Sequence, residues 1–181
     1  MKKIALALLI SLACLSQAFA VNYNFPVQDG FVTDEAEIIN DNTETALENK
    51  LIALSSEKGI QIAVVTVKSL DDNPIDDYTL NLGRTWGVGL KDVDSGVVFL
   101  IAPNEHKMRI ETGYGIEGSL TDAESSWIIA DVKTFFKNND FEGGIETGVN
   151  EIITATQSEN FASGKQITEN GLYYCFPLSD F

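Results

Sequence analysis

The chain has 181 residues, with 27 acidic against 12 basic side chains and a formal net charge of −15. A surface this acidic repels phosphate backbones and anionic lipid headgroups, which argues against nucleic acid and anionic membranes as partners. It attracts cations, although attraction by a whole surface is a weaker property than binding an ion at one site.

The first 20 residues have the three parts of a secretory signal peptide. Lysines occupy positions 2–3, an apolar run over 4–15 is too short to span a bilayer, and Ala18 and Ala20 fit the small-x-small cleavage rule. We therefore expect residues 1–20 to be a signal peptide cleaved after Ala20. The exported chain is expected in the periplasm or outside the cell.

The two cysteines bear on processing rather than on a disulfide. Cys14 marks an alternative lipoprotein processing site, but Ser11 stands where such a site usually has leucine. After cleavage only Cys175 remains, so no intramolecular disulfide can form. Residues 21–181 suit one domain and contain no second apolar run of membrane-spanning length, so we expect a soluble protein without a membrane span.

Hydrophobic periodicity predicts alternating helices and strands. Helical spacing predicts helices over 41–57, 74–86, 121–136 and from 140 onward. Runs rich in β-branched residues predict buried strands over 60–67 and 96–102, and alternation predicts a strand with one polar face over 107–112. The short connection at 103–107 predicts an antiparallel hairpin, and 32–35 is expected to be a short acidic corner.

Local signals also place the helix ends. Asn40 or Asn42 is expected to cap the first helix, and Asn73 the second. Thr121 and Glu124 form a predicted capping box. Glycines at 59 and 87 stand where helices commonly end. The tryptophans at 86 and 127 occupy helical core positions and are expected to be buried.

Helices on either side of at least three strands predict a three-layer αβα sandwich, Rossmann-like, with a mixed sheet. The periodicity fails beyond residue 157. We therefore expect one domain over 31–157, followed by a C-terminal tail over 158–181 whose structure the sequence does not indicate.

Several motifs resemble the TPM domain family. They are WGVG at 86–89, DVDSG at 92–96, RIETGYGIEGSLTDAE at 109–124 and DFEGG at 140–144, and the resemblance extends over about 31–154. The GYG turn followed by a Leu-Thr-Asp helix start is the most specific part. The resemblance implies a Rossmann-like αβα sandwich in an exported or lumenal location. It also implies a divalent-cation site, usually discussed as calcium, in an acidic groove, and the phosphatase activity reported for plant members.

Five carboxylates are candidate ligands for such a cation. Ligands of open α/β sheets bind outside the carboxyl ends of the strands, and we expect the loops at 32–35, 92–96 and 113–122 to converge there. Calcium, or magnesium in its place, takes carboxylate and carbonyl oxygens. The candidates are Asp34, Asp92, Asp94, Glu117 and Asp122. Alternatively, these residues only cap helices and solvate loops.

Four further residues are candidates for ligand binding. Gly113 and Gly115 let the backbone approach an ion or ligand closely. Tyr114 can hydrogen-bond a ligand from the same turn, although an aromatic there is as often a packing lid. Arg109, or Lys91, is the cationic partner that a phosphoryl group would need if a bound ion activated water.

Residues for catalysis without a metal are few. His106, the single histidine, falls in the expected hairpin turn, and the sequence contains neither G-x-S-x-G nor a P-loop. The pair at 92 and 94 resembles the nucleophile motif of haloacid dehalogenase phosphatases, but those aspartates follow a strand, whereas these precede one.

Three functions remain from the sequence. The first is a metal-dependent acid phosphatase acting on phosphomonoesters. The second is a non-enzymatic accessory or binding module for another cell-envelope or membrane protein, and the third is a calcium-responsive regulator. The sequence favours the cation site over the chemistry, because oxygen ligands are abundant while a nucleophile and a general base are not.

Overall fold

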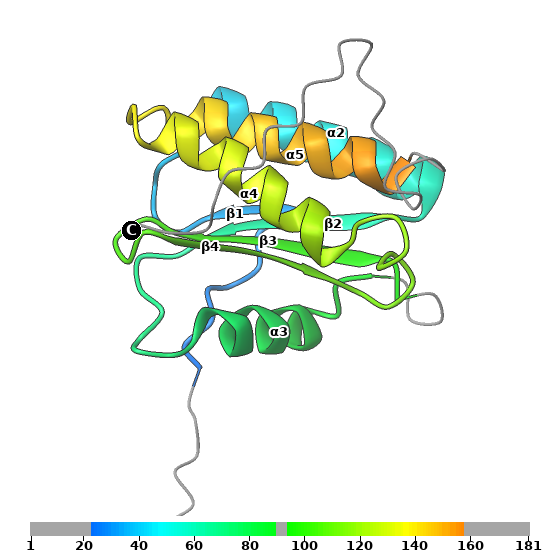
Figure 1. Cartoon of the computed structure of the whole chain (residues 1–181), viewed down its shortest axis with the longest axis horizontal. Helices are drawn as coiled ribbons and strands as arrows, with labels where there is room; N and C mark the ends of the chain where they lie inside the picture. The colour runs from blue at the N-terminus through cyan, green and yellow to red at the C-terminus, as the bar shows by residue number, and fades with distance from the viewer. Residues whose placement is uncertain (1–22, 90–93, 158–181) are drawn as a thin grey trace, which may run out of the picture.

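The computed structural model describes residues 23–89 and 94–157, which form a three-layer αβα sandwich around one mixed sheet (Figure 1). The strands are β1 (Val32–Asp34), β2 (Gln61–Thr66), β3 (Gly96–Ala102) and β4 (Lys107–Thr112). The helices are α2 (Asp41–Lys58), α3 (Ile75–Trp86), α4 (Asp122–Phe136) and α5 (Phe141–Gln157). The expected fold class is confirmed. The expected signal peptide, both cysteines and the tail over 158–181 lie outside the described residues.

The sheet has the order β1-β2-β3-β4, so β1 and β4 are its edge strands. β1, β2 and β3 are parallel, and β4 runs antiparallel to β3, which confirms the hairpin. The expected corner at 32–35 is instead mostly strand β1, in which Val32 pairs with Val64. A three-residue strand depends on pairing with a distant segment, so its local sequence does not reveal it.

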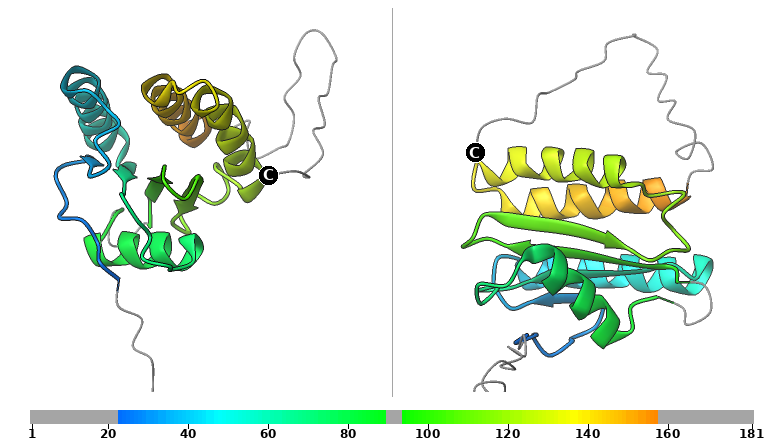
Figure 2. Two further views of the ribbon diagram at one scale, coloured as in Figure 1. Left: turned by 90° about the vertical axis from the view of Figure 1, so that its left-hand side faces the viewer. Right: turned by 60° about the horizontal axis from the view of Figure 1, so that its bottom comes forward.

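The two faces of the sheet carry separate hydrophobic cores. Figure 2 shows α2, α4 and α5 on one face and α3 on the other. All seven residues of β3 are buried, because it is covered on both faces. Val97, Phe99 and Ile101 of β3 pack under α2, α4 and α5. Val98 and Leu100 point to the opposite face and pack against α3. Among the described residues no helix is long and apolar enough to cross a membrane.

The two tryptophans differ from each other. Trp86 is half-buried and packs against the α3-side core, whereas Trp127 is 64% exposed, so the expectation that Trp127 is buried was wrong. The next residue, Ile128, points into the core together with Val132. Trp127 therefore lies to one side of the inward-facing stripe of α4. Helical spacing alone did not distinguish this exposed position from the adjacent buried position of Ile128.

The parallel strands are connected in an unusual way. The crossovers β1-α2-β2 and β2-α3-β3 step in the same direction across the sheet, but α2 and α3 cover opposite faces. Equal steps on opposite faces have opposite hands, so one of the two crossovers is left-handed. About 98% of such connections are right-handed. Because the strand order never reverses, the sheet has no topological switch point between its parallel strands.

Most helix ends follow the expected caps. The Asn40 side chain accepts from the backbone N–H groups of Asn42 and Thr43, each at 3.0 Å. The backbone N–H of Thr121 donates to Glu124 at 2.7 Å in the capping box. In α3 the N-cap is Pro74, and the expected cap Asn73 instead donates from its side chain to the Leu70 carbonyl at 2.8 Å. The expected cap of α3 was thus one residue early.

Long-range polar contacts join α2 to α5. The Asn40 backbone N–H donates to Glu142 Oε1 at 2.7 Å, and Lys50 donates to the Asn150 side chain at 2.7 Å. The partners are 102 and 100 residues apart in sequence. The core under these helices is therefore closed by segments from opposite ends of the domain.

A carboxyl pair joins α4 to α5. Burial raises the pKa of Glu151 above its ordinary value of 4.5, and the charge of Asp131 and a hydrogen bond with it raise it further. A folded-state pKa above the unfolded value means that the folded protein holds this proton more tightly. The resulting stabilisation is present below the unfolded pKa and is lost as the pH rises through the folded pKa.

We expect Glu151→Gln to stabilise the protein relative to wild type more at pH 7 than at pH 4, because the amide removes the repulsion between two ionised carboxylates. Urea unfolding of both proteins at the two pH values measures this difference. Glu146→Gln, at an exposed position on the same helix, is the control and should show a smaller pH-dependent difference. Equal effects of Glu151→Gln at both pH values would contradict the pairing.

Candidate functional site

A groove of about 330 Å³ follows the edge of β4 where α4 begins. Consecutive strand residues point to opposite faces of a sheet, so a groove that touches four in a row lies along the edge of the strand. The groove is lined by Arg109, Ile110, Glu111 and Thr112 of β4 and by Glu117, Leu120, Thr121 and Asp122. Three carboxylates and one guanidinium thus share its wall.

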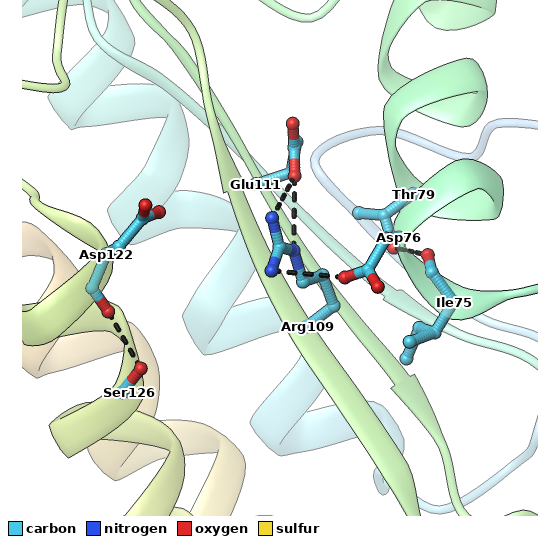
Figure 3. A network of polar contacts seen from close by, with 7 residues as sticks. All are labelled: Ile75, Asp76, Thr79, Arg109, Glu111, Asp122 and Ser126. Carbon is cyan, nitrogen blue, oxygen red and sulfur yellow. Dashed lines mark hydrogen bonds and ion pairs between the residues drawn. The ribbon is translucent and has the colours of Figure 1, made fainter.

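Arg109 is already neutralised where it lines the groove (Figure 3). Its Nη2 and Nε donate to Glu111 Oε2 at 2.9 and 3.1 Å, and its Nη1 pairs with Asp76 of α3 at 3.1 Å. Burial by itself lowers the pKa of Arg109. The hydrogen bond to Glu111 and the negative charges of Glu111, Asp76 and Asp122 outweigh this effect, so the pKa of Arg109 is raised. Arg109 therefore links β4 to α3 rather than presenting a free cation.

Glycines bring three backbones together at the loop end of the groove. The N–H of Gly113 donates to the Gly96 carbonyl at 2.7 Å, and that of Gly115 to the Asp94 carbonyl at 3.1 Å. A Cβ on Gly113 would lie 2.2 Å from the Asp94 oxygen, and one on Gly96 would lie 2.2 Å from the Val88 oxygen. Only glycine fits at either position, so these glycines fix how the loops before β3 and after β4 meet.

The structure places most of the expected site residues at this end of the sheet. Glu117 and Asp122 line the groove. Asp94 is exposed on the adjoining loop, held there by its carbonyl contact to Gly115. Tyr114 is 82% exposed. Asp92 and Lys91 lie outside the described residues, and within residues 23–89 and 94–157 no three His, Cys, Asp or Glu side chains cluster closely enough to hold a metal.

Asp34 lies at the opposite end of the sheet, so the expected convergence of the three loops was wrong. Asp34 pairs with Thr66 at the end of β2, whereas Gly96 pairs with Gln61 at its start. The five residue-to-residue steps from Gln61 to Thr66 span roughly 16 Å. Asp94 precedes its strand and Gly113 follows an antiparallel one, so both lie at the amino edge of the parallel strands.

The side chain of Asp34 organises a turn instead. Its Oδ2 accepts from the Ile39 backbone at 2.8 Å, and the Thr66 hydroxyl donates to its Oδ1. The Thr66 hydroxyl oxygen in turn accepts from the Ala36 backbone at 3.0 Å. These contacts tie the connection after β1 to the end of β2, which is the structural role that the sequence left open as an alternative.

Sequence reasoning did not identify Glu111 or Asp76 as partners of Arg109. The alternation of β4 carried a signal for the first, because residues 109 and 111 must point to the same face. No local signal marks Asp76, which reaches Arg109 only because α3 packs under β4. His106 is exposed in the hairpin turn with a φ of 53°, as expected for a turn residue.

The fold and groove define an αβα domain whose polar groove lies at the glycine-rich amino edge of a mixed sheet. The family model of the TPM domain matches residues 32–155. The chain belongs to the TPM domain family. Among curated proteins, none matches this chain.

Solved structures from three bacteria share the fold. The N-terminal domain of a protein from P. gingivalis is 35% identical, with a TM-score of 0.65, over 69% of this chain and 80% of that one. The N-terminal domain of the cg2496 protein from Corynebacterium glutamicum is 16% identical, with a TM-score of 0.56, over 88% of this chain and 100% of that one. The BA42 protein from the psychrophilic bacterium Bizionia argentinensis is 17% identical, with a TM-score of 0.58, over 66% of this chain and 82% of that one. At the two lower identities the similarity concerns the fold alone.

We expect Gly96→Ala and Gly113→Ala each to lower the free energy of unfolding by about 1–3 kcal/mol, because the added methyl must displace a backbone carbonyl. Gly118→Ala is the matched control, since its Cβ would meet nothing within 4 Å. Urea denaturation of the three variants measures the effect. If all three behaved alike, the close approach of the loops would not be a constraint on stability.

Proposed function

We propose that this TPM domain binds a divalent cation, calcium or magnesium, at the end of the groove formed by Glu117 and Asp122. The observation that carries the proposal is that these two carboxylates line one groove together with Glu111. Carboxylate and carbonyl oxygens are the ligands that calcium prefers, and it tolerates irregular geometry. Magnesium would keep several of its waters in such a site.

The donor set fits such an ion in kind. Glu117 and Asp122 contribute side-chain oxygens, and the adjoining loop carries Asp94, whose carbonyl accepts from Gly115. Among the described residues no third carboxylate completes a cluster of three. Glu111 is less available, because its Oε2 accepts two hydrogen bonds from Arg109. Water would fill the remaining positions of a calcium shell, which takes about six to eight oxygens.

The charge balance of the groove favours a cation over an anion. Among the described residues that line the groove, Arg109 is the one with a positive side chain, and Glu111 and Asp76 already neutralise it. Glu117 and Asp122 then leave a negative excess, on a chain of net charge −15. A divalent ion offsets this excess, whereas a phosphate would add to it.

Hydrolysis of phosphomonoesters ranks second to cation binding. All three nitrogens of the Arg109 guanidinium are engaged, so it would have to leave Glu111 or Asp76 to hold a phosphoryl oxygen. A bound ion would supply the positive charge that brings an anionic substrate into an acidic groove. Phosphatase activity would therefore depend on the ion. A calcium-responsive regulator requires only ion binding, and an accessory module for another envelope protein requires no hydrolysis.

The expected signal peptide at 1–20 places this proposed activity in the periplasm or outside the cell. N-terminal sequencing of the protein recovered from its native host measures this directly. A mature chain that begins at Val21 supports export with ordinary cleavage, whereas one that retains Met1 rules out cleavage after Ala20.

Calcium at a hundredfold excess over its dissociation constant should stabilise the chain from Val21 by about 2.7 kcal/mol, because only the folded state offers the site. Thermal unfolding with and without calcium or magnesium measures the gain. The Glu117→Gln, Asp122→Asn double variant should lose most of this gain. The control is the Glu57→Gln, Glu146→Gln double variant, which makes the same change in charge at exposed positions of α2 and α5 and should keep the gain. An equal gain in the groove variant would place the ion elsewhere, and no gain at millimolar ion would end the proposal.

If the domain hydrolyses p-nitrophenyl phosphate, we expect excess chelator to abolish the activity and added calcium or magnesium to restore it. The double variant should lose activity at ion concentrations that saturate wild type. Activity that persists undiminished in chelator would rule out the metal-dependent mechanism while leaving cation binding to its own test.

A further inference from the structure

We propose that the outer edge of β4 binds an extended, basic segment of a partner protein, which joins the sheet as a fifth strand. The inference goes beyond cation binding, because its main element is the backbone of β4. Strand addition takes its affinity from main-chain hydrogen bonds and its specificity from side chains at alternate positions. The observations that support it are the backbone pattern of β4, the contrast with β1 and the charge of the groove.

The hydrogen-bond pattern shows which β4 groups point outward. Gly113 donates to Gly96 at 2.7 Å, so these residues form a hydrogen-bonded pair. Such pairs alternate along an antiparallel ladder. Given the register of β3 and β4, the N–H and C=O groups of Met108, Ile110 and Thr112 point away from β3. No strand among the described residues pairs with that side of β4.

The other edge of the sheet is closed to a partner. β1 has only three residues, and the N–H groups of Phe31 and Val32 donate to Glu48 Oε2 at 2.8 and 2.9 Å. β4 has six residues and contains no proline. Shortness and capping by a side chain protect an edge strand from pairing with other chains. β1 has both forms of protection, and β4 is long enough to accept a strand.

The groove beside β4 selects the charge of the partner. Glu117 and Asp122 lie next to the outward edge, and Arg109 is held by Glu111 and Asp76. Alternate residues of an added strand point to the same side, so Lys or Arg at every second position would approach these free carboxylates. Opposite charges across the new pairing stabilise it, and a strand with acidic residues there would be repelled.

The same charges argue against two other occupants. A second copy of the chain would bring two sets of the groove carboxylates together on molecules of net charge −15 each. The tail over 158–181 carries Lys165 against Glu159, Glu169 and Asp180, so it is acidic as well. A basic segment of a different protein complements the groove, whereas both of these repel it.

The test uses a fluorescent eight-residue peptide that alternates lysine with valine or threonine, with binding to the full chain from Val21 followed by anisotropy in EDTA. We expect the Glu117→Gln, Asp122→Asn variant to bind about threefold to tenfold more weakly, as the loss of two exposed ion pairs implies. The control double variant, Glu57→Gln with Glu146→Gln, should bind the peptide as tightly as wild type does. A peptide with glutamate in place of lysine should not bind.

Two further measurements separate strand addition from general attraction to an acidic protein. N-methylation of the peptide amides that would face β4 should abolish binding, because it removes the main-chain donors. In hydrogen exchange followed by NMR, the amides of Ile110 and Thr112 should become protected when the lysine peptide is added. Equal binding of the N-methylated peptide, or protection spread evenly over the surface, would overturn the proposal.

The remaining outcomes also decide between occupants. If both amides are protected in the free chain when it is monomeric, the chain covers its own edge. If their protection rises with protein concentration, a second copy covers it. Either result overturns the proposal. Peptide binding in EDTA without stabilisation by calcium would support the strand site and reject the cation site, and the reverse result would do the opposite.

Discussion

The close contact of backbones at the amino edge of the sheet is the constraint on which the site depends. Gly113 donates to Gly96 at 2.7 Å, and a Cβ on either residue would lie 2.2 Å from a backbone oxygen of the neighbouring loop, Asp94 or Val88. This contact ends β4, starts the GYG turn and delivers the chain to the capping box at Thr121. The groove exists because β4 and the start of α4 are held on either side of that turn.

Charge then decides what the groove can accept. A guanidinium in a groove usually suggests an anion site, but Arg109 is bound by one carboxylate from its own strand and one from α3. The two carboxylates hold the guanidinium between β4 and α3, so the same contacts position Arg109 and set the polarity of the groove. The carboxylates that remain free come from the turn and from the first residue of α4.

Local sequence signals predicted most of the architecture. β3 was recognised because continuous β-branched residues require cover on both faces, and α4 because its capping box is a short-range pattern. β1 was not recognised, since its three residues form a strand only by pairing with β2.

The site was predicted in part. Glu117 and Asp122 follow the GYG turn closely in sequence, so their nearness in space was accessible to sequence reasoning. Asp34 was expected beside them because the prediction assumed that all three loops leave the carboxyl edge of the sheet. Asp94 precedes β3 and Gly113 follows the antiparallel β4, so both lie at the amino edge instead. Asp76 was missed because its contact with Arg109 depends on how α3 packs. Direction along a strand and the face covered by a helix are properties of the whole fold, and no short motif encodes them.

The division of the core between the two faces also sets when the chain can finish folding. The α3 face is built largely from the continuous stretch 61–102, so its contacts close short loops. The opposite face needs α2 from the start of the domain and α5 from its end, joined by contacts such as Asn40 to Glu142. During synthesis, a chain that has not yet produced α5 presents an apolar sheet face to its surroundings. Association with other chains competes with folding for that interval.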